Sequence, residues 1–148
     1  MKNNREVEVA TDRGMLLVPA GDAIDAIPHL AVTMTNFGQF EISHVPSGYR
    51  LLGGFERVIN AYVSMVQLQL ALNELDVDTS VTREKLKEQI SKNDKPCKEL
   101  GDITLRQWIA LSVTVGNFCS EFPWENSEEG PHAEFEKLLQ RLTEKVAA

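Results

Sequence analysis

The chain has 148 residues, of which 43% are hydrophobic and 25% are charged, and its formal net charge is −7. This composition argues against wholesale disorder. The acidic balance argues against a nucleic-acid or anionic-membrane surface, which would need concentrated lysine and arginine. Two cysteines are few for a disulfide-stapled secreted domain, and no signal peptide or membrane span is recognisable, so we expect a soluble, reduced, cytoplasmic protein.

Residues 1–53 form a half that is predicted to be rich in strands. Charged and apolar residues alternate over residues 6–11, and residues 15–18 are a short apolar run, so a hairpin is expected here. Residues 20–27 are predicted to form one helical turn that ends at Pro28.

The clearest strand pattern follows Pro28. Apolar and polar residues alternate over residues 30–35 and again over residues 40–43, and the segment 36–38 offers turn chemistry between them. This pattern predicts an antiparallel hairpin with one apolar face. Residues 49–52 are expected to add a third strand that Gly53 and Gly54 end.

Residues 55–75 are predicted to form one long helix that is too apolar on all sides for a surface helix. Between Ala61 and Leu72 the polar residues are only Ser64, Gln67 and Gln69. The helix must therefore be covered on several sides, by the sheet together with the C-terminal helices or a second subunit. The candidate subunit contact comprises Tyr62, Met65, Val66, Leu68, Gln69 and Leu72.

The C-terminal half, residues 54–148, is predicted to hold further helices. These are a short charged helix over residues 81–92, an apolar helix over residues 103–118 capped by Asp102, and an amphipathic helix that starts at Pro131. Because strands precede helices instead of alternating with them, the fold class is predicted to be α+β, with 1–148 as a single domain. A mostly antiparallel sheet of hairpins would pack against the long buried helix and two to three C-terminal helices.

A glycine-rich segment before the long helix is the first candidate site. Backbone N–H groups and the positive end of the helix dipole can hold an anion at a helix N-terminus, and nearby arginines would add charge. The spacing matches neither a Walker A motif nor a dinucleotide fingerprint, and the glycines could simply form a tight turn. The candidate ligand-binding residues are Ser47, Gly48, Arg50, Gly53, Gly54 and Arg57.

The histidines and Cys97 are the remaining candidates for chemistry. His29 and His44 would lie at the open end of the second hairpin, where they could bind a metal, share a proton, or simply be polar strand ends. Cys97 lies between Lys95 and Lys98, and such positive charge can lower a thiol pKa. No nucleophile, base and orienting group converge in sequence, so an enzyme using Ser43, His44 or Cys97 is the least favoured interpretation.

The leading functional prediction is a non-enzymatic accessory protein that self-associates, as a homodimer, and acts by binding a protein partner. A homodimer interface resembles a hydrophobic core cut in half, so an interface between two copies would bury the exposed sides of the apolar helix. The alternative is a small-anion or nucleotide-binding protein that uses the glycine-rich turn. No cofactor, metal, nucleic acid or membrane contact is expected.

Overall fold

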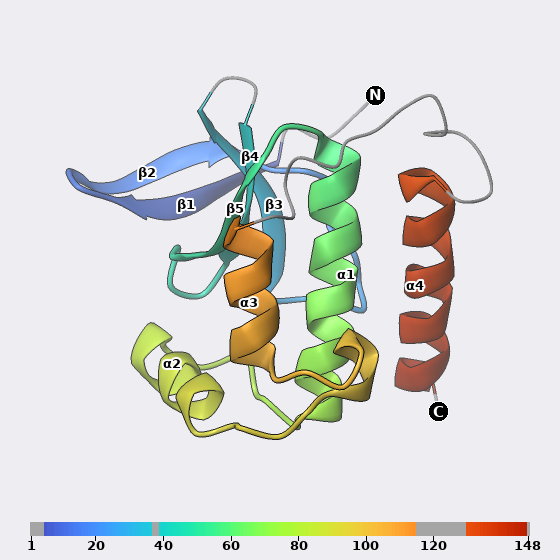
Figure 1. The fold of residues 1–148 in the computed structure, drawn as a ribbon. Coiled ribbons are helices and arrows are strands. Elements are labelled where there is room, and N and C mark those ends of the chain that lie inside the picture. The colour runs from blue at the N-terminus through green and yellow to red at the C-terminus, as the bar shows by residue number, and fades with distance from the viewer. Residues whose placement is uncertain (1–4, 37–38, 115–129, 148) are drawn as a thin grey trace.

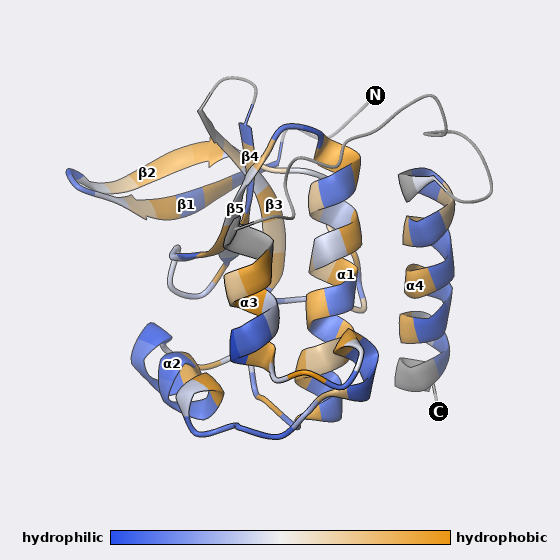
Figure 2. Ribbon diagram, in the orientation of Figure 1, coloured by the Kyte–Doolittle hydropathy of each residue, from blue (hydrophilic) through white to orange (hydrophobic). Residues whose placement is uncertain are grey.

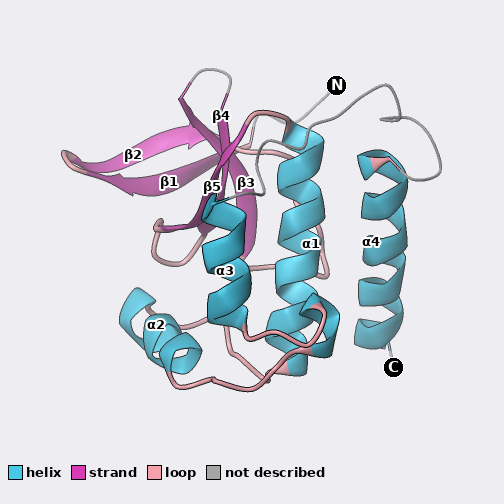
Figure 3. Ribbon diagram, in the orientation of Figure 1, coloured by secondary structure: helices cyan, strands magenta, loops and turns pink. Residues whose placement is uncertain are grey.

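The computed structural model of the chain describes residues 5–36, 39–114 and 130–147. The α+β prediction is confirmed, because the described residues form two antiparallel sheets followed by helices (Figure 1; Figure 3). The strands are β1 Glu6–Thr11, β2 Gly14–Pro19, β3 Leu30–Asn36, β4 Gln39–His44 and β5 Arg50–Phe55. The helices are α1 Val58–Glu74, α2 Arg83–Ser91, the short 3-10 helix η1 Lys98–Leu100, α3 Leu105–Thr114 and α4 Pro131–Ala147.

The first hairpin, β1–β2, forms a two-stranded sheet that projects from the rest of the molecule (Figure 1). Its register pairs Glu6 with Pro19 and Thr11 with Gly14. Val7, Val9 and Val18 are buried and form a small cluster with Ala31 of β3. The predicted pairing of these two segments is therefore confirmed.

The second sheet has the order β3–β4–β5. The predicted β3–β4 hairpin is confirmed, with Leu30 opposite His44 and Val32 opposite Ile42. The predicted end of the third strand at Gly53 and Gly54 is wrong, because β5 continues through both glycines to Phe55, which pairs with Phe40. The register of the β4–β5 pairing shifts between Phe40 and Ile42. This irregularity lies opposite Gly53 and Gly54 and allows the strand to continue through them.

Residues 20–27 do not form the predicted helical turn. Ala20 bridges Thr33, and the Gly21 N–H donates to the Val32 carbonyl at 2.8 Å. The Ala20 N–H donates to the Arg5 carbonyl at 2.9 Å, so the start of the segment bonds to its neighbours. The Ile27 N–H donates to the Ile24 carbonyl at 2.9 Å, which closes a tight turn and not a helical one.

Helix α1 begins at Val58, three residues later than predicted, because Phe55 belongs to β5. It lies between the β3–β4–β5 sheet and α4, with η1 near its C-terminal end (Figure 1). The eight residues of α1 that are buried include Ala61, Val66 and Leu72, each 0% exposed. Coverage of this helix on several sides is thus completed by the same chain.

The remaining helices differ from expectation mainly at their ends. Asp102 does not cap α3; it has φ +67° and its N–H donates to the Cys97 carbonyl at 2.9 Å. The cap is Thr104, whose Oγ1 accepts from Gln107 N at 3.1 Å while Gln107 Oε1 accepts from Thr104 N at 2.9 Å, a reciprocal capping box. Residues 115–118 of the predicted helix lie outside the described part of the chain.

Helix α4 is amphipathic, as predicted, and packs against α1. Leu138 and Leu142 are buried, and the ring of Phe135 lies edge-on to Tyr62 with centroids 5.6 Å apart. None of the described helices combines the length and the apolar character needed to cross a membrane.

Candidate functional site

The residues of the predicted anion site are spread over three separate places. Ser47 and Gly48 lie in the turn between β4 and β5, Gly53 and Gly54 lie inside β5, and Arg57 is the N-cap of α1. The expected glycine-rich turn directly before the helix is therefore not formed, because β5 extends to Phe55.

Gly53 makes room for an ion pair across the sheet. Arg50 Nη1 lies 3.0 Å from Glu41 Oε2. A Cβ at Gly53 would lie 2.8 Å from Arg50 Cδ and 3.2 Å from Glu41 Oε2, closer than ordinary packing allows. Glycine at position 53 therefore leaves space for the side chain of Arg50, which lies on the same strand. It is not part of a phosphate-binding loop.

Gly48 fastens the β4–β5 turn to β1. Its φ is +76°, and a Cβ here would lie 2.8 Å from the Glu8 carbonyl oxygen. The Gly48 carbonyl accepts a hydrogen bond from Ala10 N at 2.8 Å. Both a left-handed conformation and close backbone approach therefore require glycine.

A small cavity of about 190 Å³ lies between this turn and α2. Three of its lining side chains are basic: Arg50, Arg83 and Lys87. The Arg83 guanidinium carbon lies 4.1 Å above the centroid of the Tyr49 ring. The full lining is His44, Ser47, Tyr49, Arg50, Leu51, Arg83, Leu86, Lys87, Ile90 and Ser91. We call this cavity the basic pocket.

Within the basic pocket, His44 and Ser47 form a hydrogen-bonded pair. The distance from His44 Nδ1 to Ser47 Oγ is 2.7 Å, and His44 Nε2 lies 2.8 Å from the carbonyl oxygen of Thr79. A carbonyl oxygen can only accept, so Nε2 carries the hydrogen; in the neutral ring Nδ1 then accepts from the Ser47 hydroxyl. The imidazole is only 1% exposed, so its orientation is fixed by these two bonds and by packing.

The two histidines at the open end of the β3–β4 hairpin, His29 and His44, each form a hydrogen bond with Thr79 and not with each other. His29 Nδ1 lies 3.0 Å from Thr79 Oγ1, while His44 holds the Thr79 carbonyl. Thr79 is buried in the connection between α1 and α2. Among the described residues, no group of three or more histidine, cysteine or acidic side chains is placed to hold a metal ion.

Cys97, a candidate nucleophile in the least favoured interpretation, is a buried and hydrogen-bonded thiol. It is 0% exposed, and its Sγ donates to Glu74 Oε1 at 3.1 Å. Burial, and next the hydrogen bond to Glu74, raise the pKa of the Cys97 thiol to about 11. The pKa is therefore not lowered, although the two nearby lysines in the sequence are of a kind that can lower a thiol pKa.

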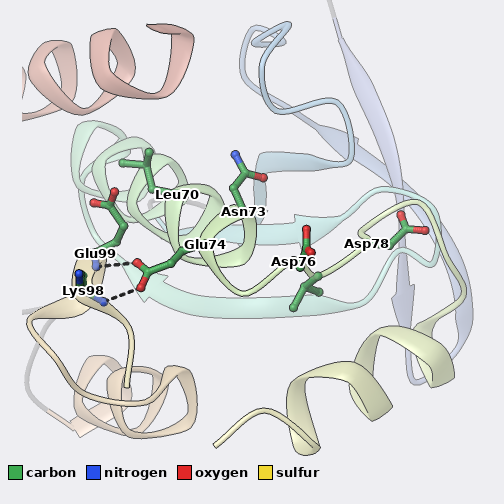
Figure 4. Close-up of a pocket in the computed structure, with 8 residues that line it drawn as sticks. Leu70, Asn73, Glu74, Asp76, Asp78, Lys98 and Glu99 are labelled. Carbon is green, nitrogen blue, oxygen red and sulfur yellow. Dashed lines mark hydrogen bonds between the residues drawn. The ribbon is translucent and has the colours of Figure 1, made fainter. Parts of the chain in front are cut away.

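A larger, open depression of about 910 Å³ lies beside the C-terminal end of α1 (Figure 4). Its central carboxylate, Glu74, accepts from the backbone N–H groups of Lys98 at 2.9 Å and Glu99 at 3.0 Å (Figure 4). Glu99 in turn pairs with Arg141. These acidic groups already serve as acceptors within the chain, so we assign them a structural role.

The predicted subunit contact on α1 is buried within one chain. Met65, Val66, Leu68 and Leu72 are at most 2% exposed, and Gln69 is 5% exposed. Tyr62 is partly buried, and its hydroxyl donates to the Asp22 carbonyl at 3.2 Å. Exposed large apolar side chains instead gather on β2, at Met15, Leu16 and Leu17 (Figure 2).

Sequence reasoning missed the α2 residues of the basic pocket. Arg83 and Lys87 are four residues apart, as are Leu86 and Ile90, so all four share one helix face. Two like charges at this spacing repel each other mildly, and a cationic stripe in an acidic chain is a signal that could have identified the site. The contribution of Thr79 has no comparable signal, because it depends on the path of the α1–α2 connection.

In comparisons with known proteins, no family model, no curated protein and no solved structure matched the chain.

Proposed function

We propose that this protein binds a small anion, such as phosphate or a small carboxylate, in the basic pocket. The observation that carries this proposal is the meeting of Arg50, Arg83 and Lys87 around one cavity in a chain of net charge −7. A pocket of opposite charge in an acidic molecule is a specific feature, since the mean charge of the surface would repel such a ligand.

The three basic side chains differ in whether another residue already pairs with their charge, and this difference indicates which of the three would contact the ligand. Arg50 is paired with Glu41 at 3.0 Å, and Arg83 has Glu84 at 4.0 Å and the ring of Tyr49 beneath it. Lys87 has no ion-pair partner among the described residues. Lys87 and Arg83 are therefore the main ligand contacts in this proposal, and Arg50 contributes charge at longer range.

The size of the cavity selects the class of ligand. At about 190 Å³, it is smaller than the ~300–1,000 Å³ typical of drug-sized ligands. A phosphate or carboxylate group fits this space, whereas a whole nucleotide would extend beyond it. If the ligand is a nucleotide, only its phosphate end would therefore occupy the pocket. The proposed setting is the cytoplasm. The acidic net charge argues against nucleic acid as a partner, because a polyanion would also contact the negative surface outside the pocket.

Isothermal titration with inorganic phosphate and with citrate tests this proposal. Lys87→Ala should weaken binding by about tenfold to a hundredfold, because a charge-assisted hydrogen bond contributes ~1.5–3 kcal/mol. Lys85→Ala is the matched control. This substitution removes the same charge from the same helix, but Lys85 lines a different cavity. Equal affinities for wild type and Lys87→Ala, or no binding of either anion, would contradict the proposal.

As a second candidate function, we propose self-association through β2, with a second copy of this chain as the occupant. Met15, Leu16 and Leu17 are 53–57% exposed, although neighbouring residues of a strand point to opposite faces. Both faces of the hairpin therefore expose apolar side chains, and the outer edge of β2 has no strand beside it in the described sheets.

The chemistry of β2 favours a copy of itself over other partners. The strand has the sequence GMLLVP and carries no charge, whereas β1 exposes Glu6 and Glu8. Antiparallel pairing of β2 with β2 of a second copy obeys two-fold symmetry and brings no like charges together. Pairing through β1 would place acidic side chains opposite each other. Such a homodimer could serve as the accessory, protein-binding unit expected from the sequence.

A further inference from the structure

We infer that Ser47 is a nucleophile activated by His44, and that the basic pocket hydrolyses small carboxylic esters that carry an anionic group. This inference rests on the proposed anion binding for the choice of substrate. It goes beyond that proposal because it assigns a reaction to the same cavity.

The geometry of the pair meets the requirements for an activated serine. Ser47 Oγ lies 2.7 Å from His44 Nδ1, within the reach that proton transfer needs. His44 is in turn oriented by a third group, the Thr79 carbonyl, at 2.8 Å from Nε2. This is the nucleophile, base and orienting group of a hydrolase triad, with the two ring nitrogens in exchanged roles and a carbonyl as the third member.

The surroundings support the base and the nucleophile separately. Thr79 is held in place by His29 through its hydroxyl, at 3.0 Å, so the orienting carbonyl does not depend on His44 alone. The N–H of Tyr49 donates to Ser47 Oγ at 3.2 Å. This bond fixes the position of Ser47 Oγ and occupies one of its lone pairs, so that the hydroxyl hydrogen can point to His44 Nδ1.

The reaction proceeds in two balanced steps. Ser47 Oγ forms a bond to the ester carbonyl carbon, the hydroxyl proton passes to His44 Nδ1, and the alcohol leaves with that proton as the carbon–oxygen bond breaks. Water then attacks the acylated serine and gives a proton to Nδ1, and the acid departs as the proton returns to Oγ. Lys87 and Arg83 would hold the anionic group of the substrate beside Ser47.

The experiment uses a neutral probe, so that it does not depend on anion binding. The full-length protein is treated with diisopropyl fluorophosphate, which forms a phosphorus–oxygen bond to an activated serine and releases fluoride. We expect mass spectrometry to show one added group, mapped to the peptide containing Ser47 in the wild-type protein. Ser47→Ala should abolish the modification, and Ser80→Ala, which removes an exposed hydroxyl that does not line the pocket, should leave it unchanged.

A second measurement separates this inference from the proposed function. Lys87→Ala should still react with the neutral probe but should lose at least tenfold in the rate of hydrolysis of an anionic ester such as succinate monophenyl ester. If Ser47 stays unmodified while phosphate binds, the hydroxyl only closes the β4–β5 turn and the inference is overturned. If Ser47 reacts but no anion binds, the nucleophile stands and the proposed function fails.

Discussion

The thiol of Cys97 remains protonated at neutral pH, because burial and the Glu74 hydrogen bond raise its pKa to about 11. The pKa of a thiol in an unfolded chain is ~8.5. A cysteine whose folded pKa is raised stabilises the fold fully below the unfolded value, and this contribution is lost as pH rises through the folded value. The thiol therefore favours folding at neutral pH and favours unfolding progressively above pH ~9.

Alkylation by iodoacetamide measures this state of Cys97. In a Cys119→Ser background, which leaves one thiol, we expect the native protein to react negligibly at pH 8 and the urea-unfolded protein to react readily. Glu74→Gln should speed the native reaction, since it removes a negative charge beside the sulfur. The variant Glu88→Gln, on the exposed surface of α2, serves as the control for a lost carboxylate. Rapid native alkylation at pH 8 would contradict the assignment of a raised pKa.

Helix α1 illustrates how much of the fold the sequence determines. Its lack of charge between Ala61 and Leu72 correctly predicts burial on several sides. The pattern cannot tell which element supplies the cover, because that depends on where α4 and the sheet come to lie. The same uncertainty placed a subunit contact on residues that the chain buries by itself.

The β5–α1 junction and the basic pocket show a different reason for error. Glycine at 53 and 54 is a local signal for a turn, but pairing of Phe55 with Phe40 continues the strand through it. Likewise, the sequence indicates Ser47 and Arg50 as candidates. Arg83, Lys87 and Thr79 approach them only after the chain folds back. Contacts between residues 44–51 and 79–91 are tertiary, and periodicity within one segment cannot predict them.

A charge introduced at Leu68 tests the burial of α1 within one chain. Leu68 is 2% exposed, so Leu68→Glu should cost more than ~4 kcal/mol of unfolding free energy and leave little folded protein. Gln67→Glu is the matched control: it adds the same charge one residue earlier, at a partly exposed position, and should shift Tm only slightly. Circular dichroism melts measure both. A well-folded monomer for Leu68→Glu would return α1 to consideration as a subunit contact.

At the scale of the whole molecule, the β1–β2 hairpin is the feature that would determine the oligomeric state. Its apolar strand projects away from the layer formed by the second sheet and the helices (Figure 2). Exposed strand edges of this kind pair readily with another strand unless charge or a covering element prevents it. The hairpin and the basic pocket are separate features, so binding of anions and self-association can be disrupted independently.

Size-exclusion chromatography with light scattering tests the hairpin interface. We expect the wild-type protein to be a dimer at micromolar concentration and Leu17→Lys to be a monomer with an unchanged circular dichroism spectrum. Leu111→Lys is the matched control, because Leu111 is 53% exposed, close to the 57% of Leu17, but lies on α3. A monomeric wild-type protein would exclude self-association, and a dimer that persists in Leu17→Lys would place the interface elsewhere.

The construction of α2 has a consequence for how a ligand reaches the basic pocket. Leu86 is the one fully buried residue of this nine-residue helix, and the helix is tied to the preceding connection by two hydrogen bonds between Gln89 and Asp78. Because its buried surface is small, we expect α2 to unfold locally at a lower free energy than the whole domain. One wall of the pocket can therefore open without global unfolding. A bound anion that joins Lys87 to the β4–β5 turn would slow amide hydrogen exchange throughout α2.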